Sequence, residues 1–402
     1  MRAVPSRPAR ARRLRTAAVG AVGVAGATGG AASLLADRVV RIRRRTRYRH
    51  HLVALDGDTV VLRRDQETAR PGTYGLSAPG AHAVIGEVIG EGSHEGNGGG
   101  GAGTDGLVRR PLLRLDHGAL RPGRVALDHV HVGDPRASLG LHHETVTLDG
   151  ECGPLPVWVL PGGDTWVVLA HGLGGSLQSS LSFLPFLHAA GHSLLVASYR
   201  NDPGAGASPD RRYHLGADEW RDLEAAMAFA LGRGARQVVL FGWSLGAAVA
   251  LQALARSELA GSVAGLVLDS PVLCWRRVLH HVGRRSAVPP PLVALSLRLV
   301  ERRIGTDLDA LDWLGRAGEL SVPVLDFHGE TDPTVPFTMS AELARRRPDL
   351  VELVVVPGAG HVGSWNVDPH AYGRHIADFV AGLSGPGVAP PGAKGGADRA
   401  ID

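Results

Sequence analysis

Residues 238–254 read VVLFGWSLGAAVALQAL, and this stretch decides the fold. The Val/Leu-rich run before Gly242 is typical of a buried strand, and the small apolar residues after Gly246 are typical of a buried helix. Ser244 stands between them. A sharp turn from strand to helix strains the backbone of such a serine and exposes its hydroxyl. Because a Cβ atom at position 242 or 246 would collide with the neighbouring chain, both positions are glycine.

A nucleophilic serine needs a base, and the base needs an acid to orient it. His361 follows the last predicted strand, in VVVPGAGHVGSW, and is expected to accept the proton of Ser244. Asp332 lies in VLDFHGETDPTVP, after the preceding strand, and is expected to orient His361. Asp269, at the end of LVLDS, is the alternative acid. A serine, a histidine and an aspartate in these roles favour acyl transfer, and they occur here in the chain order Ser244, Asp332, His361.

The glycine-rich turn LAHGLGGS, residues 169–176, follows the third predicted strand of this region. Its glycines allow backbone N–H groups to turn inward. The N–H groups of Leu173 and Leu245 are therefore expected to form an oxyanion hole. The N-terminus of the helix after Ser244 would add its positive dipole end.

Eight apolar runs between residues 144 and 356 have strand character. Helical patterns alternate with them at Leu177–Ala190, Ala217–Leu231, Leu245–Arg256 and Ala371–Leu383. This alternation predicts a mostly parallel, eight-stranded sheet with helices on both faces. A segment at 271–321 is expected to form a short helical cover over the active site.

The motifs HGLGGS, YRNDPGAGAS, GWSLGA, HGETDPTVP and GAGH together resemble the α/β-hydrolase superfamily, in particular its serine-aminopeptidase and acylaminoacyl-peptidase-like branch. The resemblance covers about residues 144–383 and implies the α/β-hydrolase fold and serine-hydrolase activity. Members of this branch include esterases, lipases, thioesterases and peptidases. One departure is Asn201-Asp202-Pro203-Gly204, where relatives often carry a Gly-His-Gly type of turn.

The N-terminal residues 1–49 form a basic leader with thirteen Arg and a single acidic residue, so the rest of the chain carries a net charge of −8. The acidic body argues against nucleic-acid binding. Residues 17–36 carry no charge and are long enough to cross a bilayer, which predicts a single-pass anchor in membrane lipid. A cleaved signal peptide of a secreted protein and a soluble leader of a cytoplasmic one are the alternatives.

The segment 50–143 has the alternating pattern of strands around a Gly-rich loop at 90–106, and predicts a small β-rich segment before the main domain. The tail 384–402 is rich in Pro and Gly and is expected to be disordered. The two cysteines form no C-x-x-C motif. We therefore expect no metal site and no organic cofactor.

The predicted function is a membrane-anchored serine hydrolase that cleaves carboxylic ester or thioester bonds of a small-molecule acyl substrate. Residues 271–304 carry seven Arg and one acidic residue, Glu301, and this charge would repel the α-ammonium of an aminopeptidase substrate. A serine peptidase of the same fold and a non-catalytic binding module remain as alternatives. The sequence does not indicate the oligomeric state.

Overall fold

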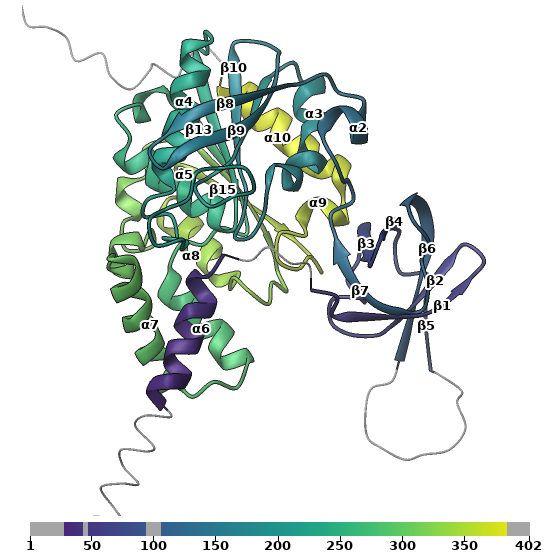
Figure 1. Cartoon of the computed structure of the whole chain (residues 1–402). Coiled ribbons are helices and arrows are strands. Elements are labelled where there is room, and N and C mark those ends of the chain that lie inside the picture. The colour runs from purple at the N-terminus through teal and green to yellow at the C-terminus, as the bar shows by residue number, and fades with distance from the viewer. Residues whose placement is uncertain (1–27, 43–46, 94–105, 384–402) are drawn as a thin grey trace, which may run out of the picture.

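The computed structural model describes residues 28–42, 47–93 and 106–383. Residues 1–27 of the leader, residues 94–105 of the Gly-rich loop and the predicted disordered tail therefore lie outside the described residues. Figure 1 shows a small β-barrel beside a larger part in which helices cover a central sheet. This arrangement follows the predicted order of a β-rich segment and an α/β domain.

The barrel is built from short antiparallel strands, which the alternating sequence pattern favours. The strands are β1 (His50–Asp56), β2 (Thr59–Arg63), β3 (Tyr74–Ala78), β4 (Ala81–Ile85), β5 (Gly90–Ser93), β6 (Gly106–His117) and β7 (Gly123–Asp128). The order is β2-β1-β7-β3-β4-β6, and β6 pairs again with β2 to close a ring of six strands. β5 pairs with β6 outside the ring. Aliphatic side chains such as Leu52, Leu76 and Ile85 fill the interior.

The main sheet contains the eight predicted strands. They are β8 (Glu144–Gly150), β9 (Gly153–Leu160), β10 (Thr165–Ala170), β11 (Ser193–Ala197), β12 (Gln237–Trp243), β13 (Val263–Asp269), β14 (Val324–Gly329) and β15 (Val351–Val356). Their order is β15-β14-β13-β12-β10-β11-β9-β8. All neighbours are parallel except that β9 runs antiparallel to both β8 and β11.

Helices cover both faces of this sheet, as its near-continuous apolar strands require. The helical elements are α2 (Pro135–Leu139), η1 (Leu177–Phe183), α3 (Leu184–Ala189), α4 (Trp220–Gly232), α5 (Leu245–Arg256), η2 (Ala260–Ser262), α6 (Trp275–Arg285), α7 (Pro290–Ile304), η3 (Leu308–Leu311), η4 (Ala317–Glu319), α8 (Thr338–Arg346), α9 (Ser364–Val367) and α10 (Pro369–Leu383). Side chains such as Val168 and Leu240 face α4 and α5. Their neighbours Leu169 and Phe241 face α3 and α10 instead.

A helix at 28–40, drawn in purple, lies beside α7 (Figure 1). Ala32, Ala36 and Val40 recur every fourth residue and are fully buried. The guanidinium of Arg303 in α7 donates to the carbonyl and hydroxyl oxygens of Ser33, at 2.8 and 2.6 Å. The small side chains of this Ala-rich stretch thus allow close packing against protein.

The predicted membrane anchor, residues 17–36, falls partly on this helix. Residues 17–27 lie outside the described residues, and residues 28–36 pack against the α/β part along one face. Within residues 28–42, 47–93 and 106–383, no helix combines the length and the apolar character that crossing a bilayer requires. Within residues 28–36, Ala32 and Ala36 are fully buried, whereas Leu34 is exposed.

The barrel contacts the α/β part close to α9, as Figure 1 also shows. The Thr73 N–H donates to the carbonyl of Asn366 at 3.0 Å, and the Asn366 amide donates back to the Thr73 carbonyl at 2.6 Å. At a second place, the Gly133 N–H donates to Oε1 of Gln178 at 3.0 Å. These bonds place the barrel against the loops that follow β10 and β15.

Candidate active site

Ser244 occupies the turn between β12 and α5 with φ of 55° and ψ of −115°, a conformation that non-glycine residues rarely adopt. A Cβ atom at Gly242 would lie 2.5 Å from the Gly246 carbonyl oxygen. A Cβ atom at Gly246 would lie 1.9 Å from the carbonyl oxygen of Ala170. The two glycines therefore permit the close packing that holds Ser244 in its strained conformation.

His361 and Asp332 lie in line with Ser244. Nε2 of His361 is 2.9 Å from the Ser244 Oγ, and Nδ1 is 2.8 Å from Oδ2 of Asp332. Ser244 follows β12, Asp332 follows β14 and His361 follows β15, so the three meet at the carboxyl edge of the parallel strands. The predicted nucleophile, base and acid thus form one continuous hydrogen-bonded chain.

The carboxylate of Asp332 is buried and well supported. Its Oδ1 accepts the N–H groups of Thr334 and Val335 at 2.7 and 2.9 Å. Burial favours the neutral acid, but the imidazoles of His361 and His328 outweigh it and hold the pKa of Asp332 well below its ordinary value. Asp332 is therefore a stable anion beside His361.

Asp269, the alternative acid, is also buried but has other partners. Its carboxylate accepts hydrogen bonds from the hydroxyls of Ser270, Ser364 and Tyr372 at 3.0–3.2 Å. Burial raises the pKa of Asp269 to about 6. Since the hydrogen bond from His361 goes to Asp332, the geometry favours Asp332 as the orienting acid.

The turn after β10 lies beside Ser244. A Cβ atom at Gly172 would lie 3.2 Å from the Cβ of Ser244. Leu173 lines the same pocket as Ser244, and Leu245 is the first residue of α5, where an N–H has no helical acceptor. Of the two predicted oxyanion donors, Leu173 thus lines the pocket, and Leu245 directly follows Ser244 at the N-terminus of α5.

His171 supports this turn through hydrogen-bond contacts with both of its ring nitrogens. Its Nε2 is 2.7 Å from Oδ2 of the buried Asp202, and Nδ1 is 2.9 Å from the Gly172 carbonyl. The same Asp202 oxygen accepts the Tyr199 N–H at 2.6 Å. Asn201-Asp202, the departure from the family pattern, therefore supports the glycine-rich turn through His171.

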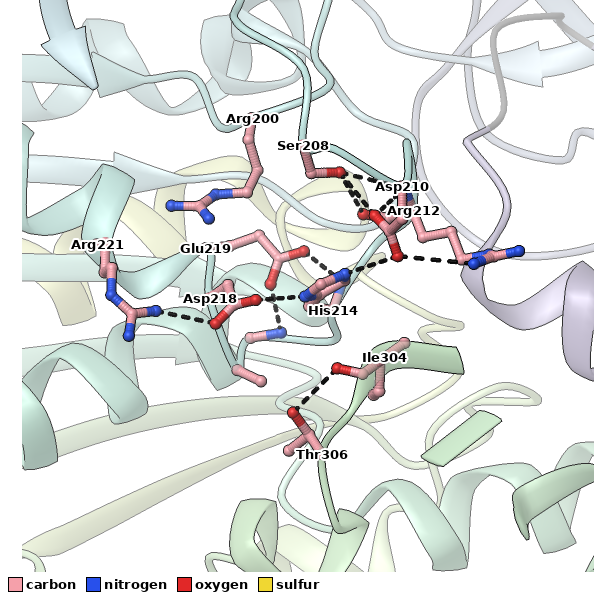
Figure 2. A network of polar contacts seen from close by, with 12 residues as sticks. Arg200, Ser208, Asp210, Arg212, His214, Asp218, Glu219, Arg221, Ile304 and Thr306 are labelled. Carbon is pink, nitrogen blue, oxygen red and sulfur yellow. Dashed lines mark hydrogen bonds and ion pairs between the residues drawn. The ribbon is translucent and has the colours of Figure 1, made fainter. Parts of the chain in front are cut away.

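Figure 2 shows a polar network around the loop between β11 and α4, formed by residues that do not line the pocket of Ser244. His214 contacts the carboxylates of Asp218 and Asp210, and the Glu219 carboxylate accepts the N–H groups of His214 and Gly216. The hydrogen bond with Asp218, aided by Asp210, raises the pKa of His214 to about 9 against the effect of burial. A charged His214 therefore links the carboxylates of the loop at neutral pH.

A cavity of about 460 Å³ opens in front of Ser244 and His361. One wall is the glycine-rich turn after β10, and another is the loop around Trp365. The facing wall comes from the barrel, namely Glu67, Arg70, Tyr74, Leu127, Asp128, His129 and Val130. The site therefore lies between the two parts of the molecule.

The predicted cover at 271–321 contributes no residue to this cavity. Arg276 of this segment pairs with Asp309 and Glu301, and Arg277 pairs with Glu342. Arg285 donates to Oε1 of Gln66 in the barrel at 2.7 Å. The cover at 271–321 therefore stays a prediction. The wall of this cavity that faces Ser244 comes from the barrel, which sequence periodicity alone does not reveal.

The barrel residues of the pocket were missed for an identifiable reason. Arg70 stands in ETARPGTYG, where the Arg-Pro-Gly turn between two strands is a signal of an exposed loop only. The contact between this loop and the turn before His361 depends on how the two parts dock.

Within the described residues, no group of three or more His, Cys, Asp and Glu side chains could hold a metal ion.

Comparison with known proteins agrees with this geometry. The alpha/beta hydrolase family matches residues 167–374, and a domain of unknown function (DUF8805) matches residues 51–128. The chain belongs to the alpha/beta hydrolase family. The predicted fold class is thereby confirmed, while the aminopeptidase-like branch is not singled out by these matches.

Among its relatives, this chain is 30% identical to a putative carbamate hydrolase of Variovorax paradoxus over 262 residues, which are 55% of this chain and 94% of that protein. It is 31% identical to an uncharacterized protein of Mycobacterium tuberculosis over 211 residues, which are 51% of this chain and 66% of that protein. A solved esterase of Pyrococcus furiosus superposes with a TM-score of 0.52 at 22% identity, covering 63% of this chain and 96% of that one. The last comparison supports the fold alone.

Proposed function

We propose that this protein is a serine hydrolase in which Ser244 is the nucleophile, His361 the general base and Asp332 the orienting acid. The observation that carries the proposal is the continuous chain from Ser244 Oγ through His361 to Asp332, with contacts of 2.9 and 2.8 Å. The strained backbone of Ser244 supports the same role, because such strain is maintained where it serves a function.

The reaction follows from this geometry in two balanced steps. Ser244 Oγ attacks the acyl carbonyl while Nε2 of His361 takes its proton, and the negative oxygen faces the N–H groups of Leu173 and Leu245. The bond to the leaving oxygen or sulfur breaks, and His361 returns the proton to that atom. Water then attacks the acyl-enzyme with His361 again as base, which releases the acid and restores Ser244.

Carboxylic esters and thioesters are the substrate class that we propose. An aminopeptidase must hold a substrate ammonium with a carboxylate, but the two carboxylates in the pocket have partners. Glu67 pairs with His50 at 3.1 Å, and Asp128 accepts from the Ser77 hydroxyl at 2.6 Å and the His129 N–H at 2.8 Å. Carbamates are a second candidate class, favoured by the similarity to the putative carbamate hydrolase.

Labelling with a fluorophosphonate tests the nucleophile. The wild type and Ser262→Ala, a control on the surface turn η2, are expected to be labelled, and Ser244→Ala is not. A panel of esters, thioesters, carbamates and aminoacyl anilides then tests the substrate class, with esters or thioesters expected to react fastest. A folded wild type that resists labelling would overturn the proposal in favour of a binding module.

A further inference from the structure

Arg70 reaches from the barrel to the turn that carries His361. A Cβ atom at Gly360, directly before His361, would lie 2.4–2.6 Å from the Cζ, Nε and Nη1 atoms of Arg70. The guanidinium therefore lies against the bare backbone of Gly360. Arg70 also lines the cavity that holds Ser244 and His361. A cation from the barrel thus stands beside the groups of the proposed triad.

Among the described residues, the guanidinium of Arg70 makes no hydrogen bond and no ion pair. The nearby Glu67 pairs with His50 instead. The hydrogen bond with His50 is the main cause that lowers the pKa of Glu67, and the charge of Arg70 makes a smaller contribution in the same direction. A planar group with five N–H donors at a pocket wall is suited to a carboxylate, which it can bind with two parallel hydrogen bonds.

The loop that carries Arg70 is held in place by a second arginine. Arg110 of β6 is completely buried, and its guanidinium donates to the carbonyls of Thr68 at 3.1 Å and Gly72 at 2.9 Å. It also donates to the carbonyl of Arg70 itself. Arg110 thus fixes the backbone on both sides of Arg70, so the side chain is presented from a rigid base.

We propose that the barrel is the substrate-recognition part of the enzyme and that Arg70 binds a carboxylate on the acyl chain of the substrate. This inference rests on the proposed function of Ser244. A single guanidinium matches a monoanion, and the nearby carboxylates of Glu67 and Asp128 disfavour a doubly charged phosphate. The preferred substrate is then the monoester of a dicarboxylic acid, with the free carboxylate at Arg70 and the ester carbonyl at Ser244.

Two esters with the same six-carbon acyl chain test this proposal, namely monomethyl adipate and methyl hexanoate, with acid release followed by pH-stat. We expect the wild type to prefer the charged ester in kcat/KM. Arg70→Ala should lower the ratio of charged to neutral kcat/KM by roughly 10–100-fold, since a hydrogen bond to a charged group contributes about 1.5–3 kcal/mol. Arg70→Lys should retain part of the ratio.

Arg121→Ala, an exposed barrel arginine outside the pocket, is the matched control and should leave the ratio unchanged. An equal loss on both esters in Arg70→Ala, or a wild type without charge preference, would overturn the proposal. Fluorophosphonate labelling of the same samples separates the two levels of inference. Labelled wild type without charge preference overturns the role of Arg70 alone, whereas unlabelled, folded wild type overturns the proposed function and this inference with it.

Discussion

The turn at Ser244 and the barrel loop at Arg70 bring polar side chains to one pocket, but they are positioned by different means. Ser244 is held by contacts within its own motif and with the adjacent strand β10. A Cβ atom at Gly242 would collide with the backbone of Gly246, and one at Gly246 with the backbone of Ala170. Arg70 is held by the side chain of Arg110, forty residues away in another strand.

This difference explains what each region reveals in the sequence. A steric requirement of the backbone forces glycine at fixed positions, so the motif around Ser244 can be recognised from the five residues 242–246 alone. A loop held by a buried side chain requires only that the side chain be present. Reaction chemistry is thus encoded locally in this molecule, and substrate recognition is encoded in the docking of two parts.

The largest predicted effect concerns the proposed catalytic residues of the α/β part. Asp332→Asn should lower kcat by about 10⁴-fold, because the amide favours the wrong tautomer of His361. Asp269→Asn should cost less than about tenfold, because Asp269 contacts hydroxyl groups rather than His361. Ester hydrolysis and circular dichroism of both variants provide the measurement. Equal losses, or a reversed order, would show that Asp269 is the acid.

The sequence predicted the α/β part of the fold well for the same reason. All eight strands of the sheet and the helices after β12 and β15 follow from apolar periodicity and a few glycines. Ser244, Asp332 and His361 could be proposed as one site because each follows a predictable strand, and parallel strands bring their carboxyl ends together. The segment 271–321, expected to be helical, contains the helices α6 and α7.

Contacts between distant segments were beyond the reach of the sequence. Residues 28–36 have an apolar composition that suits both a bilayer and a protein surface, and only the fold shows that Ala32 and Ala36 are buried against protein. The position of the barrel is equally hard to predict from the sequence, because its core residues do not indicate where its loops contact the α/β part. Only the fold brings Arg70 to Gly360.

Docking of the barrel can be broken at one glycine. Gly72 has φ of 105°, and a Cβ atom there would lie 2.3 Å from the Asn366 carbonyl oxygen across the interface. Gly72→Ala should therefore displace the barrel wall and lower kcat/KM for an ester by about tenfold or more, as a misplaced positioning group does.

The control for this variant is Gly80→Ala in the same barrel. Gly80 also has positive φ, at 76°, but nothing lies within 4 Å of its Cβ position. Gly80→Ala should lower the stability by about 1 kcal/mol through backbone strain and leave ester hydrolysis unchanged. If both variants lower kcat/KM alike, barrel stability rather than docking controls the pocket.

A smaller effect, on the pH dependence of stability, is expected from a buried carboxyl group in the central sheet. Asp326 in β14 is fully buried, and burial raises its pKa to about 7 from an unfolded value near 3.8. The folded protein therefore holds a proton that the unfolded chain releases, so stability falls as the pH rises from about 4 to 7. Asp326→Asn should flatten this dependence by on the order of 1–2 kcal/mol.

Urea unfolding at pH 5 and pH 8 measures this change. Asp149→Asn, an exposed acid on β8 of the same sheet, is the control and should keep the wild-type dependence. An Asp326→Asn variant whose stability changes with pH as steeply as the wild type would refute the assignment. Such a result would place the pH dependence on the neighbouring buried Asp269 instead.

The smallest predicted effect concerns the helix at 28–40, a third segment positioned by contacts far along the chain. Arg303→Ala removes both hydrogen bonds to Ser33, at a cost of roughly 0.5–1.5 kcal/mol. Arg302, its neighbour in α7, is exposed, so Arg302→Ala is a control that differs only in the face of the helix. Arg303→Ala should speed proteolytic cleavage near residue 42 several-fold, whereas Arg302→Ala should not. Equal cleavage rates would mean that the buried row of Ala32, Ala36 and Val40 holds the helix without Arg303. In that case this segment would resemble the Ser244 turn, with its position set by the small side chains of its own sequence, and the contrast between local and distant encoding would apply to the barrel alone.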